Sequence, residues 1–191
     1  MSLKAMILLA PGFEDLEAVT VIDLLRRAKF QVSVISLRED EVIGSRGTRL
    51  ITDSNLALLD KQVAFDVIVL PGGQPGADNL SNDPRVIRLL KNQIQANRWV
   101  AALCAAPKVL AKAGLLTGKK ITHYPGALTE QEQQGATVSD AAVEIDAPLI
   151  TGRSPGAAMD FALAIIEQVA NAQTKLQVEA ALVRRSRVSL S

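Results

Sequence analysis

Short apolar runs alternate along the chain with longer amphipathic segments. Two of these runs, 5–10 and 99–103, are continuously apolar, and 66–70 is apolar after Asp66, which is typical of parallel strands covered on both faces. Residues 31–37 instead alternate between apolar and polar side chains, as in a half-buried strand. We therefore predict four strands in the first half of the chain.

Apolar side chains at helical spacing occupy the segments between these strands and much of the second half. The strongest stripes lie in 15–28, 84–97 and 156–170. The pattern also predicts a helix over 105–114, a polar helix near 127–134, and a last amphipathic helix beginning near Thr174. The short β segments that it predicts are a hairpin within 41–56 around Gly44 and Gly47, 119–125, 143–145 and 149–151.

Strands that alternate with helices predict a mostly parallel sheet with right-handed crossovers and helices on both faces. The length of 191 residues fits one domain, and no linker or internal repeat divides it. The last eight residues, 184–191, are basic and polar, and we expect a solvated end there.

The composition argues against two classes of partner, nucleic acids and membranes. Lys and Arg number 21 against 20 Asp and Glu, and aromatics make up 3%, so neither a basic excess nor a stacking platform indicates nucleic-acid binding. No apolar stretch reaches the length of a membrane span, and the apolar start is too short for a signal peptide. We expect a cytoplasmic protein without a nucleic-acid or membrane partner.

The chain contains one cysteine, Cys104, and one histidine, His123. A single cysteine forms no internal disulfide and no cysteine-rich metal site, and it is consistent with a reducing compartment. One histidine excludes sites that need two imidazoles, such as H-E-x-x-H metalloproteases. We expect no metal.

Cys104 lies directly between the predicted strand 99–103 and the next predicted helix. A sharp strand-to-helix turn lifts a nucleophile above the sheet edge, and ligands of doubly wound folds bind at this edge. A helix N-terminus also stabilises a thiolate, so we expect the pKa of Cys104 to be lowered. The alternative is a buried, inert cysteine, which is common for a lone thiol.

Two further features follow neighbouring strand ends. Gly72 and Gly73 follow the strand 66–70, where their N–H groups can approach an oxyanion, although a plain turn is the better explanation of these glycines taken alone. Glu17 follows the first strand, and a carboxyl beside a thiolate is expected to retain a proton and act as a general acid/base. The nearby acids Glu14 and Asp15 fit solvated first-turn positions.

The segments PGFEDLEAV, SRG, VLPGG, AALCAAP and TGRSPG occur in this order along the chain. With them, the sequence resembles the ThiJ/PfpI family, which includes the parkinsonism-associated protein deglycase, over nearly its whole length. The resemblance is closest to the small deglycase-like branch. It implies a single ThiJ/PfpI (glutamine amidotransferase-like) domain over 1–191, with a flavodoxin-like α/β sandwich, a cysteine on a nucleophile elbow, and a homodimer.

The resemblance also implies a set of site residues. Cys104 matches the reactive cysteine and Glu17 the glutamate that contacts it, while Gly73 and Ala105 match the anion pocket beside Gly72. Two arginines match positions that border the same region: Arg46 in the SRG turn and Arg153 in the RSPG loop.

The chain departs from the family pattern at two positions. Protease-like members have a histidine directly after the cysteine, where this chain has Ala105. The deglycase branch often has THP, where this chain has THYP, so Tyr124 takes the histidine's place before Pro125 and His123 moves back by one. One residue along a strand reverses the side chain's face, so a structural role for His123 is favoured over a catalytic one.

The resemblance implies cysteine chemistry on reactive 2-oxoaldehydes or on glycated proteins, without a cofactor. The alternative is a redox-sensing or chaperone-type stress protein whose thiol oxidises to a sulfinate. Both functions require the same residues, so the sequence does not separate them. A class I glutaminase is disfavoured because no histidine follows His123.

Overall fold

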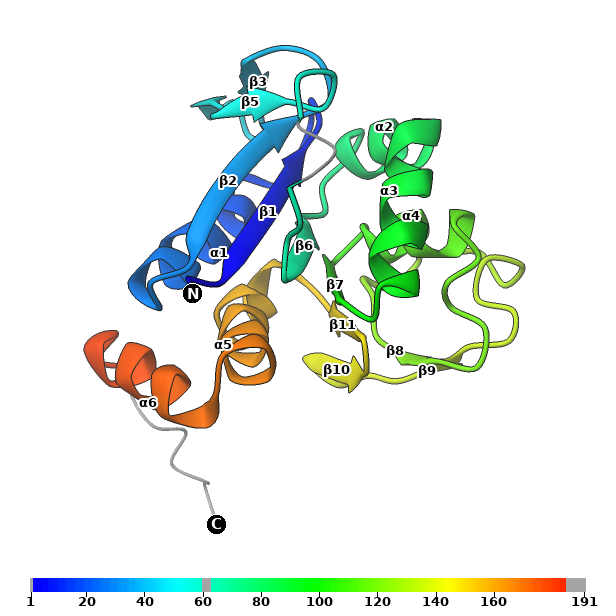
Figure 1. Cartoon of the computed structure of the whole chain (residues 1–191). Helices are drawn as coiled ribbons and strands as arrows, with labels where there is room; N and C mark the ends of the chain where they lie inside the picture. Colours follow the sequence, from blue (N-terminus) through cyan, green and yellow to red (C-terminus); the bar gives the residue numbers. More distant parts are fainter. Residues whose placement is uncertain (1, 60–62, 185–191) are drawn as a thin grey trace.

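A computed structural model describes residues 2–59 and 63–184. Its described residues form a seven-stranded sheet in the order β10-β11-β7-β6-β1-β2-β5 (Figure 1). Neighbouring strands are parallel except for the antiparallel pair β10 and β11. The strands are β1 (Lys4–Leu9), β2 (Gln31–Ser36), β5 (Ser54–Asn55), β6 (Val67–Leu70), β7 (Trp99–Leu103), β10 (Val143–Asp146) and β11 (Leu149–Gly152).

Helices cover both faces of this sheet, as Figure 1 shows. Alternate side chains of β1 enter the two halves of the core: Ile7 packs in the half that includes α1 and α5, and Leu8 packs with α3 and α4. The flavodoxin-like, doubly wound fold is therefore confirmed. The helices are α1 (Asp15–Arg27), α2 (Gly76–Ser81), α3 (Pro84–Gln95), α4 (Pro107–Lys112), α5 (Ala158–Val169) and α6 (Ala172–Ala181), with a 3-10 turn η1 (Pro155–Ala157).

The strand order reverses between β1 and β6. The chain passes from β1 to β2 on one side and later returns to β6, β7 and β11 on the other. In open α/β sheets, the carboxyl ends of the strands beside such a reversal form the usual ligand crevice. The loops after β1, β6 and β7 meet at this edge, and they contain the residues that the sequence singles out.

Two small sheets extend the main one. The predicted hairpin is present as β3 (Glu41–Ile43) paired with β4 (Arg49–Ile51). The predicted strand 119–125 is reduced to β8 (Lys120–Ile121), which pairs with β9 (Thr137–Val138). The strand predicted over 119–125 therefore ends before His123.

The polar helix predicted near 127–134 is wrong. These residues form successive turns between Gly126 and Gly135, which both have positive φ. The Glu132 carboxylate accepts hydrogen bonds from the backbone N–H and the hydroxyl of Thr129, so local polar contacts replace a helical ladder. No apolar stripe was available there to stabilise a helix by packing.

Two other helices differ from their predicted bounds, and α2 was not predicted. The helix predicted over 105–114 begins only at Pro107, and α6 begins at Ala172, where the Asn171 side chain caps it by accepting from the Thr174 N–H at 2.8 Å. Most of the predicted solvated tail, residues 185–191, lies outside the described residues. Its first residue, Arg184, forms an ion pair with Asp160 at 2.7 Å.

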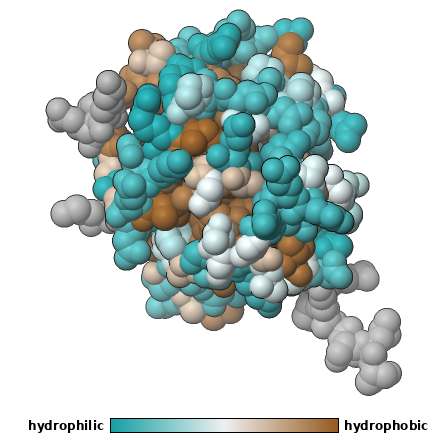
Figure 2. Space-filling view, turned by 90° about the vertical axis from the view of Figure 1, so that its right-hand side faces the viewer, coloured by the Kyte–Doolittle hydropathy of each residue, from teal (hydrophilic) through white to brown (hydrophobic). Residues whose placement is uncertain are grey.

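Figure 2 shows the side of the molecule that carries α3 and α4. Hydrophilic side chains dominate this face, and the apolar ones form small groups near its centre. Among the described helices, none combines the length and apolar character needed to cross a membrane.

Gly152 at the end of β11 offers a test of core packing. A Cβ atom at this position would lie 2.9 Å from the buried ring of Phe161. This distance is too short, so the ring would have to move. We expect Gly152→Ala to lower the free energy of unfolding by about 1–3 kcal/mol, as overpacking of a core does. Urea denaturation measures this, with Gly156→Ala as the matched control because its added methyl meets only the Ser154 hydroxyl at 3.7 Å. Equal stability of both variants would contradict the packing argument.

Candidate active site

Cys104 occupies a strained turn at the carboxyl end of β7. Its φ of 62° lies in the left-handed region, which a residue with a side chain adopts only when its surroundings hold it there. The Cys104 N–H donates to the Gly152 carbonyl at 2.8 Å, and the Cys104 carbonyl accepts from the Tyr124 N–H at 2.9 Å. Two neighbouring segments thus fix the predicted nucleophile elbow.

The loop after β6 packs directly against this elbow. A Cβ atom on Gly72 would lie 2.8 Å from both the Cys104 Cβ and the Ala105 nitrogen, so only glycine fits. The Gly72 N–H donates to Oε2 of Glu17 at 2.7 Å. The same residue therefore contacts the elbow and orients the carboxyl.

Glu17 is fully buried in the first turn of α1. Burial raises the pKa of its carboxyl to about 7, although the hydrogen bond from Gly72 and the thiol of Cys104 act in the opposite direction. Oε1 of Glu17 has no hydrogen-bond partner among the nitrogen and oxygen atoms of the described residues. This oxygen is available to the thiol, in agreement with the expectation that Glu17 binds a proton.

The lowered pKa expected for Cys104 is wrong. Burial of the thiol raises its pKa, and negative charge on Glu17 raises it further, while the Ala105 N–H acts in the other direction. The lowered pKa was expected from a helix N-terminus at Cys104, but α4 begins three residues later, at Pro107. The thiol and the carboxyl titrate as a coupled pair that resists a second negative charge.

The three N–H groups of the predicted anion pocket differ in their hydrogen-bond partners. The Gly72 N–H is already bonded to Glu17, so this amide orients the carboxyl. The Ala105 N–H interacts with the Cys104 thiol. Among the described residues no acceptor meets the Gly73 N–H, and Gly73 has a φ of 91° that suits glycine.

Glu14 and Asp15 are not the solvated acids that the sequence suggested. The Asp15 carboxylate accepts from the N–H groups of Arg46 and Thr48, both at 2.8 Å, and Glu14 Oε2 accepts from the Ser45 hydroxyl at 2.9 Å. These two side chains fasten the SRG turn onto the start of α1. Their role was missed, although three acids within a span of four residues after the first strand were a visible signal.

Arg46 lies at the margin of this arrangement. Its side chain is 76% exposed, and its Nε lies 3.9 Å from Oε2 of Glu14. Arg153 points elsewhere: its guanidinium is paired with Asp140 at 2.7 Å and also donates to the Ser139 carbonyl. The structure therefore connects Arg46 to the site through Glu14 and Asp15, and it directs the Arg153 side chain to residues 139 and 140.

His123 and Tyr124 are brought beside the elbow by the Tyr124 N–H. Tyr124 is half exposed, whereas the His123 ring is buried. His123 Nδ1 lies 2.8 Å from the Tyr124 carbonyl, and because a carbonyl only accepts, Nδ1 must be the protonated nitrogen. His123 Nε2 is buried and has no partner among the described residues. The strand alternation argued for this pair does not apply, because β8 ends at Ile121.

Within residues 2–59 and 63–184, no group of three or more His, Cys, Asp and Glu side chains is arranged to hold a metal ion. The described site combines a thiol, a carboxyl of raised pKa and backbone amides on a flavodoxin-like sheet. This combination defines a class of α/β proteins with a cysteine elbow.

Comparison with known proteins identifies the family within this class. The model of the DJ-1/PfpI family matches residues 3–168, and the chain belongs to this family. Protein dj-1beta from Drosophila melanogaster is 40% identical over 187 residues, which cover 96% of this chain and 98% of the relative. The Parkinson disease protein 7 homolog from Danio rerio is 38% identical over 182 residues, with 94% and 96% covered.

A third relative carries an enzyme name. The glutathione-independent glyoxalase DJR-1.2 from Caenorhabditis elegans is 34% identical over 166 residues, covering 86% of this chain and 87% of the relative. Among solved structures, Drosophila melanogaster DJ-1beta matches with a TM-score of 0.92 and 38% identity over 97% of this chain and 100% of that one. Toxoplasma gondii DJ-1, in a structure described as oxidized, matches with a TM-score of 0.88 and 29% identity, with 97% and 100% covered.

The raised pKa of Glu17 predicts a pH dependence of stability. A carboxyl with a pKa of about 7 in the folded protein, against 4.5 as the ordinary value, binds its proton more tightly when folded. Its contribution to the free energy of unfolding is complete below pH 4.5 and is lost as pH rises through 7. This loss amounts to about 3 kcal/mol. We expect Glu17→Gln to remove this loss in urea denaturation measured between pH 5 and 8. Asp23→Asn, an exposed change on the same helix, should keep the parent's profile. Identical profiles for the parent and Glu17→Gln would contradict the raised pKa.

Proposed function

We propose that this protein is a cofactor-independent cysteine enzyme that acts on 2-oxoaldehydes or on their adducts with proteins, as a glyoxalase or protein deglycase. The observation that supports it most directly is the buried Glu17 carboxyl, with a pKa of about 7, against the thiol on the strained elbow. A general base works best when its pKa lies near the working pH. The glyoxalase name of the Caenorhabditis elegans relative supports the same activity.

In the first step, the Cys104 sulfur adds to the aldehyde carbon. The S–C bond forms as the thiol proton passes to the ionised Glu17, and Glu17 then gives this proton to the carbonyl oxygen, which yields a hemithioacetal and leaves Glu17 ionised again. The high pKa of Cys104 is compatible with this step because the proton leaves as the bond forms, so no free thiolate needs to accumulate.

In the second step, the proton on the former aldehyde carbon moves to the adjacent carbonyl carbon through an enediol. The former aldehyde carbon is thereby oxidised and its neighbour reduced, giving a thioester of a 2-hydroxy acid. Water then adds to the thioester, the S–C bond breaks and the thiol recovers its proton. The net reaction adds one water to the 2-oxoaldehyde, and no external oxidant or reductant is required.

The backbone amides and His123 have secondary roles in this proposal. The N–H groups of Gly73 and Ala105 stabilise negative charge on the substrate oxygen. In this proposal the buried His123 Nε2, which has no hydrogen-bond partner among the described residues, forms a hydrogen bond with the substrate. Arg46 acts indirectly by holding Glu14, whose charge influences both Glu17 and Cys104.

The second candidate is a redox-sensing or chaperone-type stress protein. Cys104 is 8% exposed, so a small oxidant can reach it, and a protonated Glu17 can donate a hydrogen bond to a sulfinate. The oxidized state described for Toxoplasma gondii DJ-1 favours this candidate. Turnover separates the two functions, since a sensor needs oxidation without catalysis.

Steady-state turnover of methylglyoxal to lactate tests the enzymatic proposal. We expect Cys104→Ser to reduce turnover to the background rate and Glu17→Gln to reduce it by about 100-fold or more, the usual effect of losing a general acid/base. Asp23→Asn should leave the rate unchanged. If the parent shows no turnover but peroxide adds two oxygen atoms to Cys104 by mass spectrometry, the stress-sensor function replaces the enzyme.

We also propose a homodimer that uses the outer face of α1. Leu16 and Val19 lie one turn apart and are 52% and 46% exposed, and Met159 on the packed helix α5 is 44% exposed. We expect Val19→Glu to convert a dimer into a monomer in light scattering at micromolar concentration, because a carboxylate in an apolar interface loses its hydration. Leu176→Glu, on the 63% exposed Leu176 of α6, is the matched control. A monomeric parent would contradict the proposal.

A further inference from the structure

Glu14 places a second carboxylate beside the candidate active site, and the reaction proposed above does not use it. The Glu14 N–H donates to the Gly72 carbonyl at 2.9 Å, and Gly72 packs against the Cys104 elbow. The Glu14 side chain is 12% exposed, so water and salt screen its charge poorly. This charge raises the pKa of both Cys104 and Glu17. A negative charge other than that of Glu17 therefore acts on the place where a substrate must meet the thiol.

The SRG turn holds the Glu14 carboxylate in place. Its Oε2 accepts a hydrogen bond from the Ser45 hydroxyl at 2.9 Å. Asp15 fixes the turn in its own position by accepting from the N–H groups of Arg46 and Thr48. Glu14 is also the N-cap residue of α1, but its side chain makes no capping hydrogen bond. The position of this charge is thus set by the turn, and the helix does not need the carboxylate as a cap.

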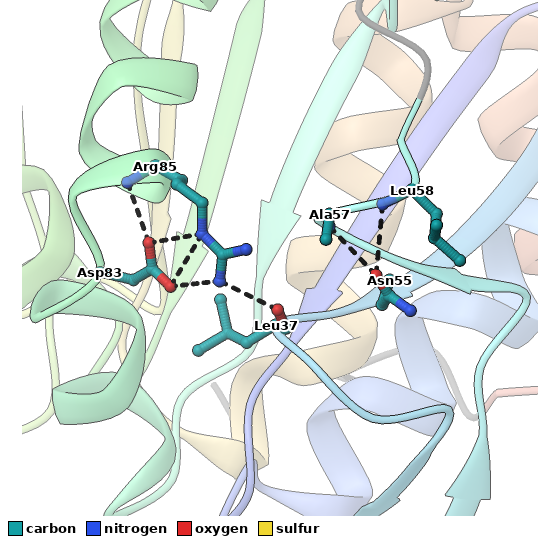
Figure 3. A network of polar contacts seen from close by, with 6 residues as sticks. All are labelled: Leu37, Asn55, Ala57, Leu58, Asp83 and Arg85. Carbon is teal, nitrogen blue, oxygen red and sulfur yellow. Dashed lines mark hydrogen bonds and ion pairs between the residues drawn. The ribbon is translucent and has the colours of Figure 1, made fainter.

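The charge of Glu14 is only weakly neutralised. Among the described residues its ion-pair partner is Arg46, whose Nε lies 3.9 Å away and whose side chain is 76% exposed. Figure 3 shows the contrast at Asp83, a carboxylate of similar exposure (10%), where Arg85 donates to both oxygens, at 3.0 and 2.6 Å. A single, long and exposed contact contributes little in comparison. The thiol therefore faces a negative charge that its surroundings leave largely uncompensated.

A fixed negative charge discriminates between substrates by their own charge. It has little effect on an uncharged aldehyde, but it disfavours a carboxylate by about tenfold when the two charges are several ångströms apart in a partly buried setting. In the proposed reaction a neutral 2-oxoaldehyde enters, and a 2-hydroxy acid, an anion at neutral pH, leaves. The same charge therefore also favours release of the product. We propose that Glu14 is a specificity-determining residue that favours uncharged carbonyl substrates over carboxylates, an inference that rests on the proposed function.

Alkylation of Cys104 by iodoacetamide and by iodoacetate tests this charge preference without turnover. The two reagents are nearly equal in size and react with the same sulfur, so the ratio of their rates cancels any change in the amount of thiolate. At pH 8.5, where Glu17 is ionised, we expect the ratio for the parent to exceed that of free N-acetylcysteine by about tenfold. Glu14→Gln should lower the ratio by about fivefold. High salt should lower it in the parent and much less in Glu14→Gln.

Three variants separate the charge of Glu14 from its structural role. Glu14→Asp keeps the charge and should keep the preference for iodoacetamide, whereas Arg46→Gln removes the paired cation and should strengthen it. Asp23→Asn, an exposed loss of charge on the same helix, should leave the ratio unchanged. Any of four results would overturn the proposal: an equal ratio for the parent and Glu14→Gln, the same loss in Glu14→Asp, a weaker preference in Arg46→Gln, or no reaction of Cys104 with iodoacetamide.

Turnover of two 2-oxoaldehydes extends the test to the reaction itself. 4,5-Dioxopentanoate carries a carboxylate, and its methyl ester does not. We expect kcat/KM of the parent to favour the ester by about tenfold and Glu14→Gln to narrow this difference. Lactate should inhibit Glu14→Gln more strongly than the parent. If the parent turns over neither compound, the proposed enzymatic function fails, whereas the alkylation ratio still decides whether Glu14 selects reagents by their charge. Equal kcat/KM for acid and ester in the parent would count against the proposal.

Discussion

The hydrogen bond between the Gly72 N–H and Glu17 Oε2 joins the parts of the candidate active site. Gly72 lies so close to Cys104 and Ala105 that any side chain on it would displace the elbow. The same amide orients the fully buried carboxyl of Glu17, which lies in the first turn of α1. The relative positions of thiol and carboxyl therefore depend on one glycine, whose missing side chain allows three strand ends to converge.

This convergence explains the protonation of the site. The carboxyl and the thiol are both buried, and burial raises the pKa of Glu17 to about 7 and raises the pKa of Cys104, on which the charge of Glu17 acts in the same direction. A helix N-terminus alone would favour a thiolate, but burial and the neighbouring acid outweigh it. Such a pair suits a reaction in which a proton passes between sulfur and carboxyl as a bond to carbon forms. It suits less well a site that keeps a free thiolate exposed to solvent.

The loops at the carboxyl edge of the sheet are fastened by ion pairs and hydrogen bonds. Glu14 and Asp15 hold the SRG turn, and Asp83 and Arg85 fasten the start of α3 to Leu37, the residue after β2. Rigid loops of this kind hold polar groups in place before a ligand arrives.

The sequence by itself determined the sheet, its covering helices and the elbow, because apolar periodicity directly encodes which faces are buried. It also indicated Cys104, Glu17 and the glycine pair, since residues that follow parallel strands share one edge. Only the tertiary structure decided how these groups interact. That Gly72 donates to Glu17, that Asp15 holds the SRG turn, and that burial raises the pKa of the thiol all depend on contacts between distant segments. The failed helix near 127–134 and the weakly paired charge of Glu14 have the same origin, because packing and hydrogen-bond partners are properties of neighbours in space rather than of neighbours in the chain.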